Sequence, residues 1–570
     1  MNKIGIIASI LACVVLALVI TSCSKDDPKP AAELEVSTEQ LTFQKEGEMK
    51  FFHLKSNVDW AVSSDEPWCT VNPSSGEAGT VKIEVTVVAN SGAAERTATI
   101  TVQAGNLSGH VTVTQSGGIT VSEDQFDIAA DEDEITIEVQ SPGAYEVDIE
   151  GDWITPAEGS TTTSQKFDIA VNASLGDRTG TITFSSGEAS TTVTITQAGQ
   201  PLTIPADNTG MASNAVTLAS KMTVGWNLGN TLEATSVTNG VYTASETMWG
   251  NPKTTKTLID GIKAAGFNAV RLPCAWSGYI DNVETHHIKD SWLARVKEVI
   301  DYCVDNDMYV IINIHWDGGW LENNPVYSKQ DAINEKQQAL WEQIAVYFRN
   351  YDEHLLFAGT NEVHYDYGTP TTEHIAVQES FNQTFVDAVR STGGRNATRN
   401  LVVQAYNTNI SFSKTYMTMP EDAAGVTDRL MAEVHFYDPY EFTLQDPSTK
   451  YLWGADFAGS PNTTTWGQEA WVDEEFAIMK TEFVDNGIPV ILGEYGAMLR
   501  SSLPEPALSN HIQSRNHYFN YVNKAAKLNG MITFYWDSGY TGDGGSGLFN
   551  RSTGAIVYEA AVNAIISAYD

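Results

Sequence analysis

Two glutamates in the carboxy-terminal part of this 570-residue chain each come shortly after an apolar run. Glu362 follows the run 355–358, and Glu494 follows the run 490–493. Two carboxyl groups that face one another across a pocket suit the cleavage of a glycosidic bond, because one can protonate the departing oxygen while the other attacks the anomeric carbon. A single glutamate after a strand is most often solvated or structural, so the hypothesis depends on the pair.

Further polar and aromatic side chains follow other apolar runs of the same region. They are Arg271, His315, Asn361, His435, Tyr437 and Trp536. A lone histidine in such a place is more often a hydrogen-bonded structural residue than a catalyst. The joint occurrence is informative, because the carboxyl ends of the strands of a parallel barrel converge on one face. The sequence therefore predicts one pocket that contains all of these side chains.

The elements that must position these residues follow a regular alternation from about residue 210 onward. Strands are expected at 223–226, 269–272, 310–314, 355–358, 401–404, 430–434, 490–493 and 531–535. Helices are expected at 255–265, 292–305, 334–350, 372–390 and 515–528. Eight such units predict an α/β fold, a (β/α)8 TIM barrel over residues 201–570, whose long βα loops form the active-site face.

The preceding residues differ in character, since short alternating runs of Thr, Val and Ile are broken there by Gly, Asn and Ser. RTATITV at 96–102 recurs as RTGTITF at 178–184, and VTQSG at 113–117 recurs as ITQAG at 195–199. These repeats predict two small all-β immunoglobulin-like sandwiches over 35–117 and 118–200. Trp68 and Trp153 are expected to anchor the two cores, which favours a spacer function, and sugar binding is the alternative.

The first residues have the layout of a secretory signal, with Lys3 followed by an apolar run to Ile20. The ending Thr21-Ser22-Cys23 resembles a bacterial lipobox, in which Cys23 becomes the lipidated first residue of the mature chain. A plain signal peptide or an uncleaved anchor is the alternative. Residues 24–34 are expected to be a linker, whose acidic start resembles the surface-export tag of Bacteroidetes lipoproteins. The sequence thus predicts an outer-membrane lipoprotein that faces the cell exterior.

The composition restricts the partners. A net charge of −39 disfavours nucleic acid and anionic lipid headgroups, so membrane contact is expected only through the lipid. The charge does not disfavour a neutral polysaccharide. No metal-ligand spacing, phosphate loop or nucleotide fingerprint occurs, so neither a metal nor a cofactor is expected. Three scattered cysteines beyond the leader cannot form a disulfide framework, and a monomer is expected.

Several motifs together resemble those of glycoside hydrolase family 5 over about residues 215–570. The motifs are VRLP at 270–273, NIH at 313–315, NE at 361–362, HFY at 435–437, GEYG at 493–496 and YWD at 535–537. GWNLGNTLE at 225–233 and ETMWGNP at 246–252 resemble its subfamily 4. The two amino-terminal units resemble BACON modules. This resemblance implies a retaining enzyme that cuts inside β-1,4-glucans.

The same resemblance implies a role for each carboxyl group. Glu362 would be the general acid/base and Glu494 the nucleophile. Asn361 would hydrogen-bond the 2-hydroxyl of the reacting sugar, and His435 would influence the protonation of Glu362. The chain departs from the family pattern after the acid/base, where Val363 stands in place of the usual proline.

Other positions are implied to bind substrate. Arg271 and Tyr437 would keep the carboxylate of Glu494 ionised and oriented. His315 would bind sugar hydroxyls, and Trp536 would stack on the reacting ring. Trp316 replaces a second histidine of the family pattern and would add a stacking surface. Further platforms are expected among the loop tryptophans Trp249, Trp276, Trp320, Trp453 and Trp466.

The sequence therefore predicts an endo-β-1,4-glucanase that acts on β-glucan polysaccharides, among them xyloglucan, mixed-linkage glucan and soluble cellulose. Gly318 and Gly319 are expected to leave lateral room for the side chains of xyloglucan. One alternative is a mannan- or xylan-cleaving enzyme of the same family. The other is a non-catalytic surface glycan-binding protein, although such a protein usually lacks one catalytic carboxylate and this chain has both.

Overall fold

The computed structural model describes residues 31–131, 133–187 and 189–569. Contacts divide these residues into two compact units, an all-β unit in the amino-terminal part and a second unit that contains residues 197–569. The predicted signal segment and Cys23 lie outside the described residues. Among the helices in the described ranges, none combines the length and the hydrophobicity that a bilayer span requires.

The first sandwich is formed by two sheets. One has the order β1 (Leu34–Val36), β3 (Met49–Ser56), β7 (Gly79–Val87), β5 (Cys69–Asn72). The other has the order β2 (Gln40–Phe43), β9 (Leu107–Gln115), β8 (Arg96–Ala104), β4 (Trp60–Ser64), β6 (Ser75–Gly76). Alternate residues of β3 and β7 are buried, as the period of two requires. Trp60 is buried in this core, and Trp68 packs on it beneath the guanidinium of Arg96.

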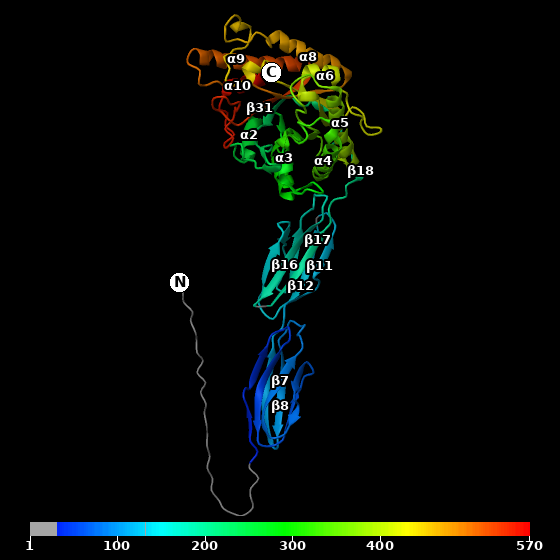
Figure 1. The fold of residues 1–570 in the computed structure, drawn as a ribbon, viewed down its shortest axis with the longest axis vertical. Helices are drawn as coiled ribbons and strands as arrows, with labels where there is room; N and C mark the ends of the chain where they lie inside the picture. The colour runs from blue at the N-terminus through cyan, green and yellow to red at the C-terminus, as the bar shows by residue number, and fades with distance from the viewer. Residues whose placement is uncertain (1–30, 132, 188, 570) are drawn as a thin grey trace, which may run out of the picture. The chain divides into compact units, whose positions relative to one another are not determined.

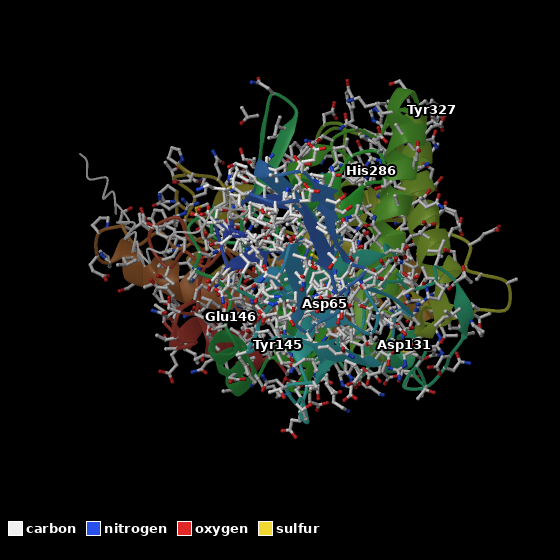
Figure 2. The ribbon with its side chains drawn as sticks, turned by 90° about the horizontal axis from the view of Figure 1, so that it is seen from below. Asp65, Asp131, Tyr145, Glu146, His286 and Tyr327 are labelled. Carbon is white, nitrogen blue, oxygen red and sulfur yellow. The ribbon has the colours of Figure 1, made fainter. Side chains whose placement is uncertain are left out.

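The second sandwich repeats this plan with two four-stranded sheets. One has the order β10 (Thr120–Val121), β12 (Asp133–Gln140), β15 (Ser164–Ile169), β14 (Ile154–Pro156). The other has the order β11 (Gln125–Ile128), β17 (Ala189–Gln197), β16 (Arg178–Ser186), β13 (Glu146–Glu150). Trp153 packs on its core, and Tyr145, labelled in Figure 2, donates its hydroxyl hydrogen to the Thr162 carbonyl at 2.9 Å. The prediction of all-β modules is confirmed.

One repeated hydrogen bond explains the repeated motifs. Arg96 Nε donates to Gln115 Oε1 at 2.9 Å, and Arg178 Nε donates to Gln197 Oε1 at the same distance. Gln115 Nε2 in turn donates to main-chain carbonyls of the loop after β2, among them that of Gln44 at 3.0 Å. The Arg and Gln of each motif therefore join the last strand of a sandwich to its earlier segments.

Eight parallel strands close into a barrel in the second unit, so the (β/α)8 prediction is confirmed. They are β19 (Val224–Leu228), β22 (Ala269–Leu272), β25 (Tyr309–Asn313), β26 (Leu355–Ala358), β28 (Leu401–Gln404), β29 (Leu430–Phe436), β30 (Val490–Tyr495) and β31 (Met531–Asp537). Pairing of β19 with β31 closes the ring. The strands are buried on both faces, which is why each one appears in the sequence as a continuous apolar run.

Helices lie on the outside of this barrel (Figure 1). The expected ones are α2 (Lys256–Ala264), α3 (Asp290–Val304), α4 (Tyr327–Tyr347), α5 (Thr372–Ser391) and α9 (Ala507–Leu528). Helices that the sequence did not predict are α1 (Ala215–Ala219), α6 (Ile410–Tyr416), α7 (Tyr440–Thr443), α8 (Glu469–Glu482) and α10 (Glu559–Ile566). The three cysteines within the described residues, Cys69, Cys274 and Cys303, are buried and form no disulfide there.

The pairing of β29 with β30 is irregular near the carboxyl ends of the two strands. The register shifts between Val434 and His435, and past this shift His435 pairs with Glu494. Such irregularities bend a strand and redirect its side chains, and they are frequent beside active sites. This one places the imidazole of His435 next to the carboxyl group of Glu494.

Candidate active site

Glu494 lies near the carboxyl end of β30, and its side chain is only 8% exposed. Arg271 Nη1 donates to its Oε1 at 2.9 Å, and the Tyr437 hydroxyl donates to its Oε2 at 3.0 Å. Burial raises the pKa of Glu494, and the charge of Glu362 adds to this effect. The two donors hold the carboxyl group in one orientation, with both oxygens occupied by protein groups.

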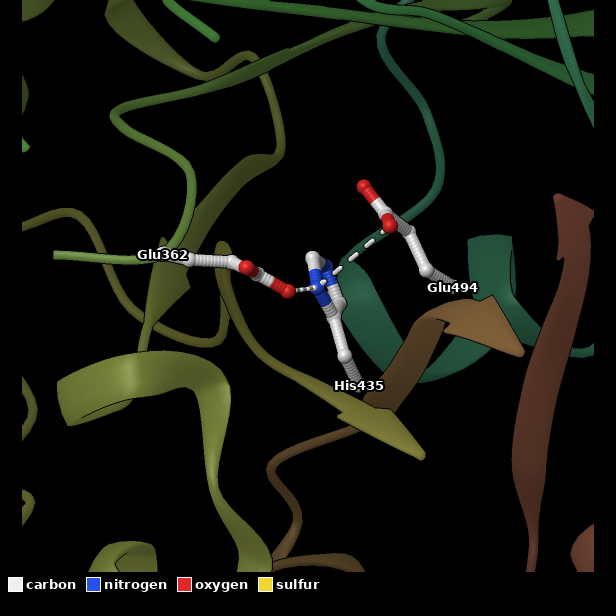
Figure 3. A group of neighbouring side chains, drawn as sticks. All are labelled: Glu362, His435 and Glu494. Atoms are coloured by element: carbon white, nitrogen blue, oxygen red, sulfur yellow. Dashed lines mark hydrogen bonds and ion pairs between the residues drawn. The ribbon is translucent and has the colours of Figure 1, made fainter. Parts of the chain in front are cut away.

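Glu362 lies in the loop after β26 and is more open, since 29% of its side chain is exposed. His435 Nδ1 lies 2.6 Å from its Oε1, and Figure 3 shows the imidazole between the two carboxyl groups. One carboxylate oxygen of Glu362 and one of Glu494 lie within 4.8 Å of each other. This spacing fits the roughly 5–5.5 Å between the carboxyl groups of retaining glycosidases, and it is shorter than the roughly 6.5–9.5 Å of inverting ones.

His435 is the shared partner of three carboxyl groups. Its Nδ1 contacts Glu362, its Nε2 lies 3.3 Å from Glu433, and Nδ1 is 3.8 Å from Glu494. Burial lowers the pKa of His435, but these three negative charges outweigh burial and raise it to about 10. The imidazole is therefore protonated at neutral pH.

The charge of His435 acts on both members of the glutamate pair. Burial raises the pKa of Glu362, yet the hydrogen bond and charge of His435 bring it below its usual value in the absence of substrate. Because both carboxyl groups share one imidazolium and repel each other, they titrate as one unit. Glu362, Glu494 and His435 also offer atoms close enough to hold a metal ion. In the structure the three side chains are joined as an ion-pair network.

Arg271 is fully buried and reaches four partners. Its Nε forms an ion pair with Glu433 at 3.0 Å, its Nη1 also donates to Asn227 Oδ1 at 3.1 Å, and its Nη2 donates to Asn361 Oδ1 at 2.9 Å. The fourth partner is Glu494, described above. Glu433 was not among the residues predicted from the sequence, although a charged residue inside the apolar run 430–434 was a usable signal.

His315 and Trp536 form an aromatic wall of the site. Their rings are stacked, with centroids 5.7 Å apart and planes inclined by 9°. Burial lowers the pKa of His315 well below its usual value, and the charges of Arg271 and His435 add to this effect. The neutral imidazole can both donate and accept hydrogen bonds, as recognition of sugar hydroxyls requires.

A cavity of about 700 Å³ is lined by both Glu362 and Glu494. Of the predicted residues, Glu362, His435, Tyr437, Glu494 and Trp536 line it. It is also lined by residues that the sequence did not single out, among them Tyr367, Asn407, Thr408, Tyr440 and Glu475. These come from the loops after β26, β28 and β29 and from α8, where no pattern distinguished them from other loop residues.

The loop tryptophans do not form one row. Trp276 and Trp453 are fully buried, and their indole N–H groups donate to the main-chain carbonyls of Asn313 and Gly467. For these two the platform prediction is wrong, because both side chains belong to the large buried core that the barrel strands share with the outer helices. Trp249, at 41%, and Trp466, at 39%, are the exposed ones, and neither lines the cavity.

The segment after β25 contains the other two tryptophans. Trp316 and Trp320 are half-buried at either end of η2 (Asp317–Gly319), and Trp320 Nε1 donates to Asp317 at 2.8 Å. Gly318 was expected to leave lateral room for the side chains of a substrate, but it does not. A Cβ there would lie 2.5 Å from Val237 of the hairpin β20 (Thr235–Thr238) and β21 (Val241–Ala244), which fills the space.

Comparison with known proteins identifies the barrel. The family model described as cellulase (glycosyl hydrolase family 5) matches residues 233–542, which include both glutamates. The chain belongs to glycosyl hydrolase family 5. Residues 33–118 match the viral BACON domain model, and residues 143–198 match the BACON model described as a putative binding domain. The family and BACON predictions are confirmed.

Relatives within family 5 cover different shares of the chain. A xyloglucan-specific endo-β-1,4-glucanase of Bacteroides ovatus is 37% identical over 99% of this chain and 97% of its own length. Endoglucanase A of Paenibacillus barcinonensis is 37% identical over 62% of this chain and 89% of its own length. The former therefore matches the amino-terminal modules as well as the barrel.

Solved structures of family 5 likewise align with either nearly the whole chain or about 62% of it. The Bacteroides ovatus xyloglucanase in complex with an XXXG heptasaccharide aligns with a TM-score of 0.62 at 36% identity, and covers 95% of this chain and all of that one. A GH5-4 broad specificity endoglucanase from Bacteroides salanitronis aligns with a TM-score of 0.56 at 37% identity, and covers 62% of this chain and 93% of that one.

Proposed function

We propose that this family 5 protein is a retaining endo-β-1,4-glucanase that hydrolyses internal bonds of β-glucans, with xyloglucan as a principal substrate. The observation that carries the proposal is the pairing of two unlike carboxyl groups within 4.8 Å at one cavity. Glu494 is held by two donors, whereas Glu362 is open to the cavity. That asymmetry matches a fixed nucleophile and an acid/base that must reach the leaving group.

In the first step, a carboxylate oxygen of Glu494 bonds to the anomeric carbon while the glycosidic C–O bond breaks. The proton of Glu362 passes to the departing oxygen. Sugar binding displaces water from the site and disfavours an ionised Glu362, because Arg271 and His435 are already balanced by Glu433 and Glu494. Asn361 holds the 2-hydroxyl of the sugar during this step.

In the second step, water enters where the leaving group departed. Glu362, now ionised, takes a proton from this water. The water oxygen bonds to the anomeric carbon, and the bond between that carbon and Glu494 breaks. Two displacements at the same carbon retain its configuration. Trp536 offers an apolar face on which the reacting ring can stack.

Xyloglucan is proposed because of the relatives. The full-length relative is named as xyloglucan-specific, and the structure that covers 95% of this chain is described as a xyloglucanase in complex with an XXXG heptasaccharide. Other structural neighbours are named as broad specificity endoglucanases, which supports activity on unbranched β-glucans as well.

Digestion of a polysaccharide panel tests this function. The purified protein should cleave xyloglucan, mixed-linkage glucan and soluble cellulose to mixed oligosaccharides, and the viscosity should fall before many reducing ends appear. NMR should show the β-anomer as the first product. Mannan or xylan as the better substrate would favour the alternative specificity, and binding without cleavage would favour a glycan-binding protein.

We further propose that Cys23 is lipidated and that the BACON modules hold the barrel away from the outer membrane. The proposal is supported by the signal-like leader and by the placement of Trp68 and Trp153 on the sandwich cores. Cell fractionation tests it, because Cys23→Ala should release the protein from membranes. Membrane attachment that survives this substitution would contradict a lipid anchor.

A further inference from the structure

A third glutamate touches the segment that contains the acid/base. Glu322 lies between η2 and α4, and it is only 5% exposed. Its Oε2 accepts hydrogen bonds from Asn361 Nδ2 at 3.1 Å and from the main-chain N–H of Glu362 at 3.2 Å. Its own main-chain carbonyl accepts from the N–H of His364 at 2.9 Å. Three hydrogen bonds thus join one residue to the short segment 361–364.

These contacts determine which atom of Asn361 can meet a ligand. Arg271 Nη2 donates to the amide oxygen, and one hydrogen of the amide nitrogen is given to Glu322. The second N–H of Nδ2 is the donor that remains for a sugar hydroxyl. Without Glu322 the nitrogen end of the amide would lose this partner, although the oxygen end would keep its own.

The loop that presents Glu322 is itself fixed by buried polar groups. Asp317 accepts hydrogen bonds from the N–H and hydroxyl of Ser277 at 3.0 and 2.7 Å, and from the indole of Trp320. Lys336 Nζ donates to the same hydroxyl and lies 4.0 Å from the Trp320 ring centroid. The carboxyl group of Glu322 therefore approaches Asn361 from a rigid support.

Apolar packing also joins the segment that contains Glu322 to the segment that contains Glu362. Leu321 and Val363, the neighbours of Glu322 and Glu362, belong to one buried cluster. Val363 stands where the family pattern has a proline, so its backbone lacks the restriction that a ring would impose. Packing and the Glu322 hydrogen bonds hold this segment in the absence of that ring.

We propose that Glu322 is a positioning residue of the reaction, which orients the Asn361 amide and fixes the main chain of Glu362, and through it the acid/base carboxyl group. This inference rests on the proposed function. Burial, together with the charges of Glu362 and Glu494, raises the pKa of Glu322 to about 8. The group is thus mainly a neutral acid at neutral pH, and a glutamine can reproduce its accepting oxygen.

Three variants of Glu322 and one control test the proposal. Glu322→Gln should keep kcat on soluble β-glucan within about threefold of wild type, because its amide oxygen accepts the same two hydrogen bonds. Glu322→Ala should lower kcat about 100-fold with little change in KM, as expected for a misplaced reacting group. Glu322→Asp, whose shorter side chain withdraws the acceptor, should behave like Glu322→Ala.

The control is Glu353→Ala. Glu353 is 9% exposed, accepts two hydrogen bonds from Ser213, and precedes β26 at the end of the strand opposite to Asn361. Its removal should lower thermal stability without lowering kcat at a temperature where the protein is folded. Thermal unfolding of every variant, followed by circular dichroism, defines that temperature.

A second readout separates positioning from support of the fold. An aryl glycoside with a good leaving group needs little protonation. The fold-loss in kcat caused by Glu322→Ala should therefore be about ten times smaller on the aryl glycoside than on polymer. Equal losses on both substrates, equal losses for Glu322→Gln and Glu322→Ala, or a Glu322→Ala variant with wild-type kcat would each overturn the inference. A wild-type protein inactive on every β-glucan would instead refute the proposed function.

Discussion

His435 and Glu494 pair directly across two neighbouring barrel strands, immediately after the register of β29 and β30 shifts. The shift brings the imidazole to 3.8 Å from the carboxyl group of Glu494 and leaves its Nδ1 against Glu362. One cation consequently serves both carboxyl groups. Any change in the position or protonation of His435 should therefore affect the proposed nucleophile Glu494 and the proposed proton donor Glu362 together.

Substitution of each glutamate should have a different consequence. Glu494→Gln should abolish turnover on polymer and on activated aryl glycosides alike, because no nucleophile remains. Glu362→Gln should lose about 10²- to 10⁴-fold on polymer but form the glycosyl-enzyme readily from an activated substrate. Burst kinetics with an aryl glycoside measure the difference, and identical behaviour of the two variants would contradict the assigned roles.

Gly493 should tolerate no side chain. A Cβ at this position would lie 1.9 Å from Oε1 of Glu433, the carboxylate that pairs with Arg271. We expect Gly493→Ala to lower the free energy of unfolding by about 1–3 kcal/mol and to lower kcat strongly. Gly496→Ala is the matched control, because its Cβ would make only ordinary contacts, the nearest at 3.6 Å. Comparable kcat values for the two variants would contradict this account.

Stability should depend on pH through His435. Its pKa of about 10 exceeds the ordinary value of 6.5, so the folded protein binds one more proton than the unfolded chain between those values. The contribution of His435 to the free energy of unfolding is complete below about pH 6.5 and is lost as pH rises toward 10. Over this range the free energy of unfolding falls by up to about 1.4 kcal/mol per pH unit. Urea titrations of wild type and His435→Gln should show a steeper decline for wild type, and parallel declines would exclude His435 as the cause.

Removal of the amino-terminal modules should leave the chemistry intact. Deletion of residues 24–200 should change kcat on soluble β-glucan by no more than about threefold, since every residue proposed to take part in the reaction lies in the second unit. Steady-state kinetics of the shortened and full-length proteins provide the comparison. A loss of more than about tenfold would show that the modules take part in substrate binding.

The barrel strands could be predicted because burial on both faces makes each one a continuous apolar run. The helices were predicted less completely. Tyr327 begins α4 before the expected residue 334, and Ala507 begins α9 before 515, because the first turns of both helices contain few apolar residues. Helix α8 was also missed, although half of its residues are apolar.

Site residues on the barrel strands or directly after them could be predicted from the sequence, whereas site residues farther along the long loops could not. Arg271 and Glu494 lie in strands, so their places follow from the barrel itself. Glu322 and Tyr367 depend on the paths of long loops, which are set by tertiary contacts. Trp276 and Trp249 look alike in the sequence, yet Trp276 is buried in the barrel core and Trp249 is exposed, because tertiary contacts decide which loop residues reach that core.

The guanidinium of Arg271 contacts groups from β19, β29, β30 and the loop after β26 at once. Local opening of any of these segments at the catalytic end would expose a buried charge, so these segments should exchange their amide hydrogens last and as one cooperative group. Substitutions that adapt the protein to differently branched polymers should then occur in the surrounding loops. Specificity can diverge among descendants of this chain while the reacting centre stays unaltered.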